Sequence, residues 1–254
     1  MRGIVTPGRV SIITAVYNAA PTLEDCLLSV RNQSYRDVEH IVIDGGSTDG
    51  SVEILHRHSS LLAYWVSEPD SGVYDAWNKG LSAATGEWIG FLGADDVLLP
   101  DAVSKYLTVC GGTGAQYVCS LVRLIRPGLP DKIIGRPWSW PAFQRKMTTA
   151  HVGSLHRYGL FDKYGNYDTD YKIAGDYELL LRPGKDLNSI FVDEVTVAML
   201  AGGVSDTFAA LTEIRRAKIH TGGRNRVWAF WELWVERLKL TVRRIETAFA
   251  SFVL

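Results

Sequence analysis

The 254-residue sequence has few cysteines, no long apolar run and almost no net charge. Cys26, Cys110 and Cys119 form no CxxC pair and fit no zinc spacing, so we expect reduced thiols in a cytosolic protein. No window approaches the roughly 20 apolar residues of a membrane-spanning helix, and residues 1–9 lack the apolar stretch of a signal peptide. The net charge of −1 excludes a general attraction to nucleic acid, so affinity for a membrane or polyanion must come from a local patch.

What the chain does have is the composition of an ordinary globular protein, 46% hydrophobic and 22% charged. Four short apolar runs alternate with helical patterns and short turns. The runs are 10–16, 38–43, 62–67 and 87–92, and the helical patterns are 22–30, 51–58, 73–84 and 100–109. This alternation predicts an α/β fold, with a parallel sheet covered by helices on both faces. Thr22 is the expected cap of the first helix.

Beyond residue 110 the alternation stops. The sequence predicts strands over 117–125 and 189–199, a helix over 171–182, and a long irregular segment over 126–141 that is rich in Pro, Gly and Trp. We find no internal repeat and no low-complexity tract.

Acidic residues collect where the predicted strands end. Asp44, the segment 68–70, and the pair Asp95 and Asp96 each follow a strand, and ligands of such sheets bind beyond the carboxyl ends of the strands. Two adjacent carboxylates repel each other, which raises the pKa of one of the two carboxyl groups. A bound divalent cation removes this repulsion. The alternative is that these aspartates cap the amino end of a helix.

The segment 68–80 adds acids, an amide and a lysine at the same edge. Asp75 and Lys79 are four residues apart, so they share one face of the predicted helix, where Lys79 could offset phosphate charge. The alternative is a surface ion pair worth well under ~1 kcal/mol.

Four motifs follow one another in the first hundred residues. They are SIITAVYN at 11–18, VIDGGSTDG at 42–50, DSGVYDAWNKG at 70–80 and GADD at 93–96. In this order they resemble family 2 glycosyltransferases of the GT-A fold, strongly over 9–100 and more weakly to about 206. The resemblance implies a GT-A domain over 1–206 and a C-terminal amphipathic helical extension over 207–254. Within the domain, 9–110 would be the nucleotide-sugar-binding half and 111–206 the acceptor-binding half.

The resemblance also assigns a donor site for a UDP- or GDP-linked sugar. Asp44 is expected to face the base. The family's D-x-D metal motif reads Ala94-Asp95-Asp96 here, which makes Asp96 the expected ligand of Mn²⁺ or Mg²⁺ and turns Asp95 toward the ribose. The donor-binding set it implies is Thr14, Val16, Tyr17, Asn18, Asp44, Gly45, Asp70, Gly72, Tyr74, Asp75, Asn78, Lys79, Ala94 and Asp95.

The catalytic base is expected in the segment 171–182. Many family members have Glu-Asp there, and this chain has Gly175-Asp176, so Asp176 is the candidate and Glu178 a weaker one. An acceptor hydroxyl must lose its proton as it attacks, and a positioned carboxylate can take it. The alternative for Asp176 is a helix cap.

Two further residues are expected on the acceptor or phosphate side by the same resemblance, His151 and Gly203. A lone histidine is otherwise a structural residue, and Gly203 lies in a Gly-Gly pair that would otherwise be a plain turn.

The tail 224–254 has tryptophans at helical spacing together with several arginines and lysines. This pattern is typical of a helix that lies on an anionic membrane surface. We therefore expect a cytoplasmic protein on the inner face of the cell membrane, acting on a saccharide or lipid-linked acceptor in cell-surface polysaccharide assembly. The alternatives are a helix packed on the domain or on a second subunit.

The function that these patterns favour is an inverting, metal-dependent glycosyltransferase. A nucleotidyltransferase on a related fold would need a basic, Gly-rich loop after the first strand, and 17–21 has neither feature. A non-catalytic nucleotide-sugar-binding protein would not need Asp176 beside a complete donor site.

Overall fold

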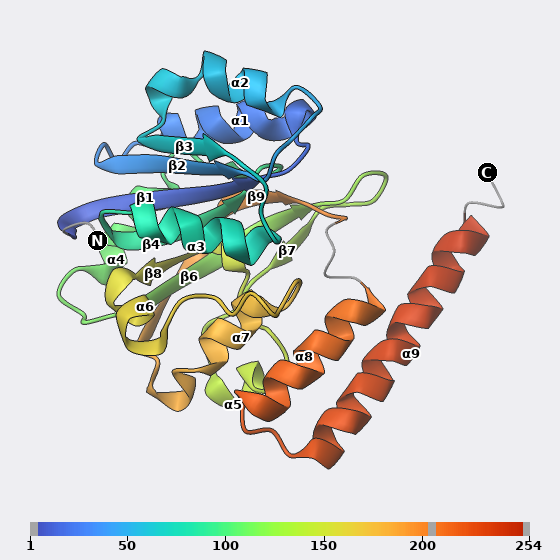
Figure 1. Ribbon diagram of the computed structural model, residues 1–254. Coiled ribbons are helices and arrows are strands. Elements are labelled where there is room, and N and C mark those ends of the chain that lie inside the picture. Colours follow the sequence, from blue (N-terminus) through green and yellow to red (C-terminus); the bar gives the residue numbers. More distant parts are fainter. Residues whose placement is uncertain (1–4, 203–206, 251–254) are drawn as a thin grey trace.

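The computed structural model describes residues 5–202 and 207–250, and within them one sheet forms the centre of the molecule (Figure 1). Along the sheet the strands run in the order β3-β2-β1-β4-β8-β6-β9-β5, with β7 paired to β6. Their bounds are β1 Thr6–Val16, β2 Val38–Asp44, β3 Tyr64–Ser67, β4 Gly86–Gly93, β5 Val97–Leu98, β6 Tyr117–Ile125, β7 Lys132–Ile134, β8 Ser154–Arg157 and β9 Ser189–Leu200.

The sheet is mixed, so the expected parallel arrangement is confirmed only for its first part. β3, β2, β1 and β4 are parallel neighbours. β8 then runs antiparallel to both β4 and β6, and β6 pairs in parallel with β9. The four-residue β8 contains a single apolar residue, Leu155, and lies directly between a 3-10 turn at His151–Gly153 and α6 at Tyr158–Tyr164, which is why the sequence pattern did not reveal it.

Helices cover both faces of the sheet, as expected. Their bounds are α1 Ala20–Arg31, α2 Ser51–Arg57, α3 Val73–Ala83, α4 Ala102–Cys110, α5 Trp140–Phe143, α6 Tyr158–Tyr164, α7 Gly175–Leu181, α8 Phe208–His220 and α9 Arg226–Ala250. Successive strand residues point to opposite faces. Ile13 and Phe91 pack with α3, α6 and α7, whereas Ile12, Val42 and Leu92 pack with α1, α2 and α4.

Two helix boundaries differ from the expected ones. α1 begins at Ala20, two residues before Thr22, whose hydroxyl donates back to the carbonyl of Ala19 instead of accepting a capping bond. The helix expected over 171–182 is limited to α7, because the backbone of 172–174 donates its amides to a side chain of another helix.

The last two described helices lie side by side below the sheet, and α9 extends past the rest of the molecule (Figure 1). Glu232 of α9 accepts from Lys218 at 2.9 Å and from Arg224 at 2.5 Å, and Ala229 and Leu240 are buried. These contacts fix the first half of α9 on the domain. None of the helices within the described residues has both the length and the apolar character needed to cross a membrane.

Candidate active site

The loops after β1 and β2 are tied together at the carboxyl edge of the sheet. The amide of Asn18 donates to the hydroxyl of Ser47 at 2.7 Å, and the Asn18 carbonyl oxygen Oδ1 accepts from the amide of Thr48 at 2.9 Å. Asn18 has a φ of 49°, a conformation that asparagine tolerates better than most residues. The expected donor residue Asn18 therefore shapes this edge with its own side chain.

Asp44 ends β2 with its carboxylate fully buried. Oδ2 accepts from the amides of Gly46 and Ser47 and from the hydroxyl of Ser67, at 3.0, 2.9 and 2.7 Å, and Oδ1 accepts from the hydroxyl of Ser47 at 2.5 Å. The carboxylate thus holds the following loop in place, and its expected contact with a nucleotide base stays a prediction.

Two of the expected donor residues at the end of β1 are buried, and the two that follow the strand, Tyr17 and Asn18, are exposed. Thr14 is fully buried, with its hydroxyl 2.9 Å from Nε2 of His40, and Val16 is 2% exposed. Tyr17 is 70% exposed. Direct contact of the Thr14 side chain with a nucleoside does not fit this position, because the residue faces the α1 side of the sheet. Tyr17 is placed to meet a ligand.

The segment after β3 folds back against the end of β2. A Cβ added to Gly45 would lie 2.7 Å from Oδ2 of Asp70, so the two expected donor residues are in direct contact and only glycine leaves room. The other oxygen of Asp70 accepts from the amide of Gly72 at 2.9 Å, and Asp75 Oδ2 accepts from the amide of Ser71 at 3.0 Å. The acids Asp70 and Asp75 thereby fix the turn that starts α3.

Lys79 lies within this acidic turn. Its ammonium is 2.8 Å from Glu68 and 3.9 Å from Asp75, and it donates to the carbonyl of Pro69 at 3.2 Å. The hydrogen bond to Glu68 raises the pKa of Lys79, so it remains a cation. The positive charge is available at the donor edge, although Glu68 already shares it.

Asn78 connects α3 to the second half of the chain. Its side-chain amide donates to the carbonyl of Tyr167 at 2.9 Å, and its oxygen accepts from the amide of Tyr167 at 3.0 Å. Both polar atoms of the side chain therefore bond within the protein and position the loop at Tyr167, and the expected contact of Asn78 with the donor stays a prediction.

Asp95 and Asp96 meet beside Gly93 at the end of β4. Asp95 is exposed, Ala94 and Asp96 are buried, and one oxygen from each carboxylate would lie within 3 Å of a Cβ added to Gly93. Asp96 accepts from the amides of Gly93 and Leu200, at 3.2 and 3.3 Å. Neither aspartate caps α4, because β5 intervenes and Asp101 holds that position.

This pair fits a divalent cation. Burial, followed by the charge of Asp95, raises the pKa of Asp96 to about 7, a conflict that a cation relieves. Among the residues that the structure describes, no group of three or more His, Cys, Asp or Glu side chains could hold a metal. A site made of one or two carboxylates suits Mg²⁺ or Mn²⁺ bound together with a diphosphate, whose oxygens complete the shell.

The candidate base Asp176 lies at the first turn of α7, directly against the donor segment. The hydroxyl of Tyr74 donates to Asp176 Oδ1 at 3.2 Å and to the carbonyl of Ile173 at 2.7 Å, and Lys172 Nζ donates to the carbonyl of Ser71 at 2.9 Å. Residues a hundred positions apart therefore meet here. The amide of Tyr177 also donates to Oδ1, and no group in the described part of the chain donates to Oδ2.

Gly175 leaves room for the ring of Tyr74 beside Asp176. A Cβ at this position would lie 2.8 Å from the ring of Tyr74. Glycine lets the Tyr74 ring reach Asp176, and burial raises the pKa of Asp176 to about 6.

One residue that the sequence analysis missed supports this arrangement. Glu213 of α8 accepts from the backbone amides of Lys172, Ile173 and Ala174 at 2.8 to 3.1 Å. A single carboxylate thus holds the loop that leads into Asp176. No local motif marks Glu213, because its partners lie about forty residues away.

Glu178 is the weaker of the two base candidates in this structure. It is 5% exposed, pairs with Arg182 at 2.5 Å and accepts from the hydroxyl of Thr221 at 2.8 Å. Arg182 in turn donates to the carbonyls of Tyr164 and Asn166. Glu178 therefore joins helices and a loop as part of an ion-pair network.

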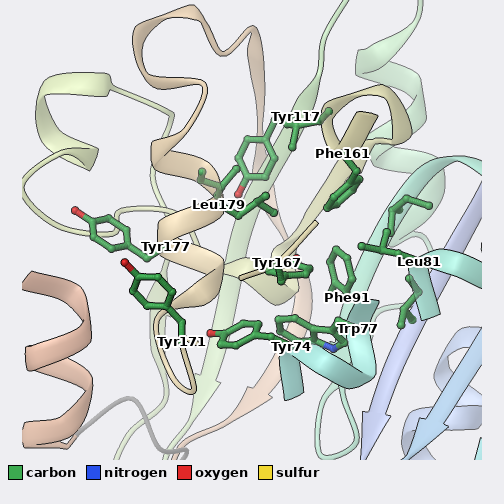
Figure 2. Close-up of a cluster of buried hydrophobic side chains, with 14 of the residues drawn as sticks. Tyr74, Trp77, Leu81, Phe91, Tyr117, Phe161, Tyr167, Tyr171, Tyr177 and Leu179 are labelled. Carbon is green, nitrogen blue, oxygen red and sulfur yellow. The ribbon is translucent and has the colours of Figure 1, made fainter. Parts of the chain in front are cut away.

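His151 lies inside a cluster of aromatic side chains beneath the site. Figure 2 shows the core of this cluster, in which Tyr74, Trp77, Phe91 and Tyr167 gather between α3 and the sheet. His151 stacks on Phe91, and its Nε2 is 3.0 Å from the hydroxyl of Tyr167. Burial and the neighbouring His156 hold its pKa well below the ordinary value. A neutral, buried imidazole does not fit the expected acceptor contact. Gly203 lies outside the described residues.

This geometry defines a class of enzyme, and comparison with known proteins agrees. The fold is that of GT-A glycosyltransferases. S. aureus TarS in complex with UDP-GlcNAc superposes with a TM-score of 0.66 at 15% identity, covering 89% of this chain and 70% of that one. The mannosyltransferase PcManGT from Pyrobaculum calidifontis, in complex with GDP-Man and Mn²⁺, gives a TM-score of 0.65 at 17% identity over 97% of this chain and 81% of that one.

Residues 11–161 match glycosyl transferase family 2, and the chain belongs to this family. A Mycobacterium tuberculosis protein named as an uncharacterised glycosyltransferase is 40% identical over 180 residues, which is 68% of each chain. The protein is therefore a glycosyltransferase, as its motifs predict.

Proposed function

We propose that the chain is an inverting, metal-dependent glycosyltransferase that moves a sugar from a nucleoside diphosphate to an acceptor hydroxyl, with Asp176 as the base. The observation that carries the proposal is the contact between the donor segment and the base. Tyr74, which lies in the first turn of α3 close in sequence to Asp70 and Asp75, donates directly to Asp176. Residues expected to bind the donor and the residue expected to activate the acceptor thus share one hydrogen bond.

The reaction follows from this placement. The acceptor oxygen attacks the anomeric carbon, the bond from that carbon to the diphosphate oxygen breaks, and the acceptor proton passes to Oδ2 of Asp176. Tyr74 and the amide of Tyr177 hold Oδ1, which keeps the carboxylate oriented. Attack from the side opposite the leaving group inverts the anomeric centre.

Asp96 and Asp95 are the residues that would hold the cation. A divalent ion bound there would stabilise the negative charge of the departing nucleoside diphosphate. TarS binds UDP-GlcNAc and PcManGT binds GDP-Man with Mn²⁺, so a uridine or guanosine donor and a metal are the chemistry to test first.

The experiment is a screen of nucleotide sugars. Purified protein is mixed with UDP- and GDP-linked sugars, with Mn²⁺, Mg²⁺ or EDTA, and thermal stabilisation and nucleoside diphosphate release are measured. We expect one nucleotide sugar to stabilise the protein only when a divalent ion is present, and to release its nucleoside diphosphate. Thermal stabilisation by the nucleotide sugar that is the same in EDTA as with the ion would contradict the metal assignment. Release of pyrophosphate from a sugar phosphate and a nucleoside triphosphate would instead indicate a nucleotidyltransferase.

The exposed face of α9 supports a second proposal, contact with an anionic membrane surface. Trp231, Trp234 and Leu238 are 57 to 58% exposed and lie on one side of the helix, opposite the buried Ala229 and Leu240. Over 226–242, where side-chain burial is described, the exposed large apolar residues of α9 are Val227, Trp228, Phe230, Trp231, Trp234, Val235, Leu238 and Val242. An apolar stripe of this size on a helix with arginine and lysine at its sides is typical of interfacial helices.

Sedimentation with vesicles tests this proposal. We expect the protein to bind vesicles of phosphatidylglycerol and not of phosphatidylcholine, and Trp234→Gln with Leu238→Gln to abolish binding. Equal binding of the double variant would refute the membrane contact.

A further inference from the structure

A cavity of about 510 Å³ opens between α7, the loop 145–147 and the pair α8–α9. Its volume is within the range of sites that hold one small ligand. Most of its wall is apolar, formed by side chains such as Ile173, Leu211, Ile214, Trp228, Trp231 and Val235. Asp176 is also part of the wall, so the candidate base faces the cavity.

Two observations connect this cavity to the reaction. Asp176 accepts a hydrogen bond from the hydroxyl of Tyr74 on the donor side, and it also lines the cavity. Of the other charged side chains at the wall, Lys218 and Arg224 bind Glu232 and Glu236 binds Lys239, while Arg145 and Lys146 lie at the loop side of the wall. An occupant therefore meets a mainly apolar surface, with the carboxylate of Asp176 at the wall where an acceptor hydroxyl is needed.

We propose that this cavity is the acceptor subsite, and that it selects an acceptor whose hydroxyl-bearing head is joined to an apolar aglycone. The head group reaches Asp176, and the aglycone lies between α8 and α9, against Ile214 and Trp231. The inference rests on the proposed function and adds the class of acceptor. Filling the cavity removes apolar wall from water, which is the source of the selectivity.

The chain provides a matched pair of tryptophans for the test. Trp231 and Trp234 are on the same helix and are 57% and 58% exposed, but only Trp231 lines the cavity. Trp231→Ala removes part of the wall, Ile214→Trp fills the cavity, and Trp234→Ala is the control. All assays are done without vesicles, so the exposed face of α9 has no membrane to bind.

The acceptors are methyl and octyl glycosides of glucose, galactose, mannose and N-acetylglucosamine, with octyl glycosides below their micelle concentration. Nucleoside diphosphate release gives kcat/KM with the donor found above, and calorimetry gives binding. For the accepted sugar we expect the octyl form to exceed the methyl form by at least about tenfold, as an apolar pocket rewards buried methylenes. Trp231→Ala and Ile214→Trp should lower kcat/KM severalfold more for the octyl acceptor than for the methyl acceptor, so that the preference shrinks. Trp234→Ala should behave as wild type.

Three results would overturn the inference. Equal use of octyl and methyl glycosides by the wild type removes the apolar subsite. If Trp231→Ala and Trp234→Ala reduce the preference for octyl glycosides equally, the effect arises outside the cavity. A wild-type dimer that Trp231→Ala converts to monomer makes the cavity a subunit interface. If octyl glycosides bind to the wild type and not to Ile214→Trp while no nucleotide sugar is consumed, the apolar subsite holds and the transferase proposal falls.

Discussion

The donor side and the base side of the site are built in different ways. On the donor side, several acids bind backbone amides two to four residues away, as Asp70 does with Gly72 and Asp75 with Ser71, although Asp96 also binds the amide of Leu200. On the base side, Asp176 depends on Tyr74, 102 residues away, and its loop depends on Glu213, about forty residues away.

This difference separates what a motif can encode from what only the fold can assemble. The donor turns form from neighbouring residues, so their sequences are short, ordered and recognisable. The base side needs α3, α7 and α8 to pack before any of its contacts exist. Substitutions on the donor side should therefore change donor binding, whereas substitutions on the base side should change turnover.

The largest effect is expected at the base itself. Asp176→Asn keeps the size of the side chain and the contact with Tyr74 but cannot accept a proton. We expect turnover to fall about 10³-fold, with donor binding by thermal shift unchanged. Asp170→Asn, at an exposed position in the same segment, is the control. Near-normal turnover of Asp176→Asn would remove the base assignment and with it the contrast between the two sides.

A smaller loss is expected at the cation site. Asp96→Asn removes the charge that the pair with Asp95 offers, so we expect kcat/KM to fall at least about 10²-fold and donor stabilisation to lose its dependence on Mn²⁺. Asp101→Asn, an exposed aspartate five residues on, should keep both. If Asp96→Asn stays as metal-dependent as the wild type, the ligands of the ion lie elsewhere.

The sequence predicted the strands and turns of the first hundred residues well because their signals are local. The strand ends at Asp44 and Gly93 and the turn before Val73 lie where the apolar runs and turn residues place them. The contacts that the sequence did not predict are those with distant partners. Thr14 bonds to His40 on the neighbouring strand, and Asn78 bonds to Tyr167.

The same reason accounts for the mixed half of the sheet. β8 is four residues long and pairs with β4 and β6. Its identity as a strand therefore comes from partners such as Ile89 and Tyr117, which lie 67 and 39 positions before His156, rather than from its own composition. His151 also matched a family position, yet the aromatic side chains around it bury the ring.

An intermediate effect is expected at Glu213, which acts through the loop before Asp176. Glu213→Ala leaves three amides without their acceptor, so we expect kcat to fall about tenfold with little change in donor KM, and the free energy of unfolding to fall by about 1 to 3 kcal/mol. Glu213→Gln keeps one strong acceptor and should recover part of kcat. Thr212→Ala on the exposed side of α8 is the control. A rise in donor KM equal to the loss in kcat would mean that α8 serves both sides alike.

The smallest expected effect is on the pH profile, and it tests whether Tyr74 joins the two sides. Burial raises the pKa of Asp176 to about 6, so kcat/KM should fall below pH 6 as the base becomes protonated. The hydroxyl of Tyr74 lowers this pKa, so Tyr74→Phe should move the acidic limb to higher pH. Because the folded pKa exceeds the ordinary value of 3.8, Asp176 favours the folded state most below pH 3.8, and this contribution is lost as pH rises through 6. Asp176→Asn should therefore flatten the fall in melting temperature between pH 4 and 7. If Tyr74→Phe leaves the acidic limb of the kcat/KM profile unchanged, the hydrogen bond between Tyr74 and Asp176 does not determine the protonation state of the base.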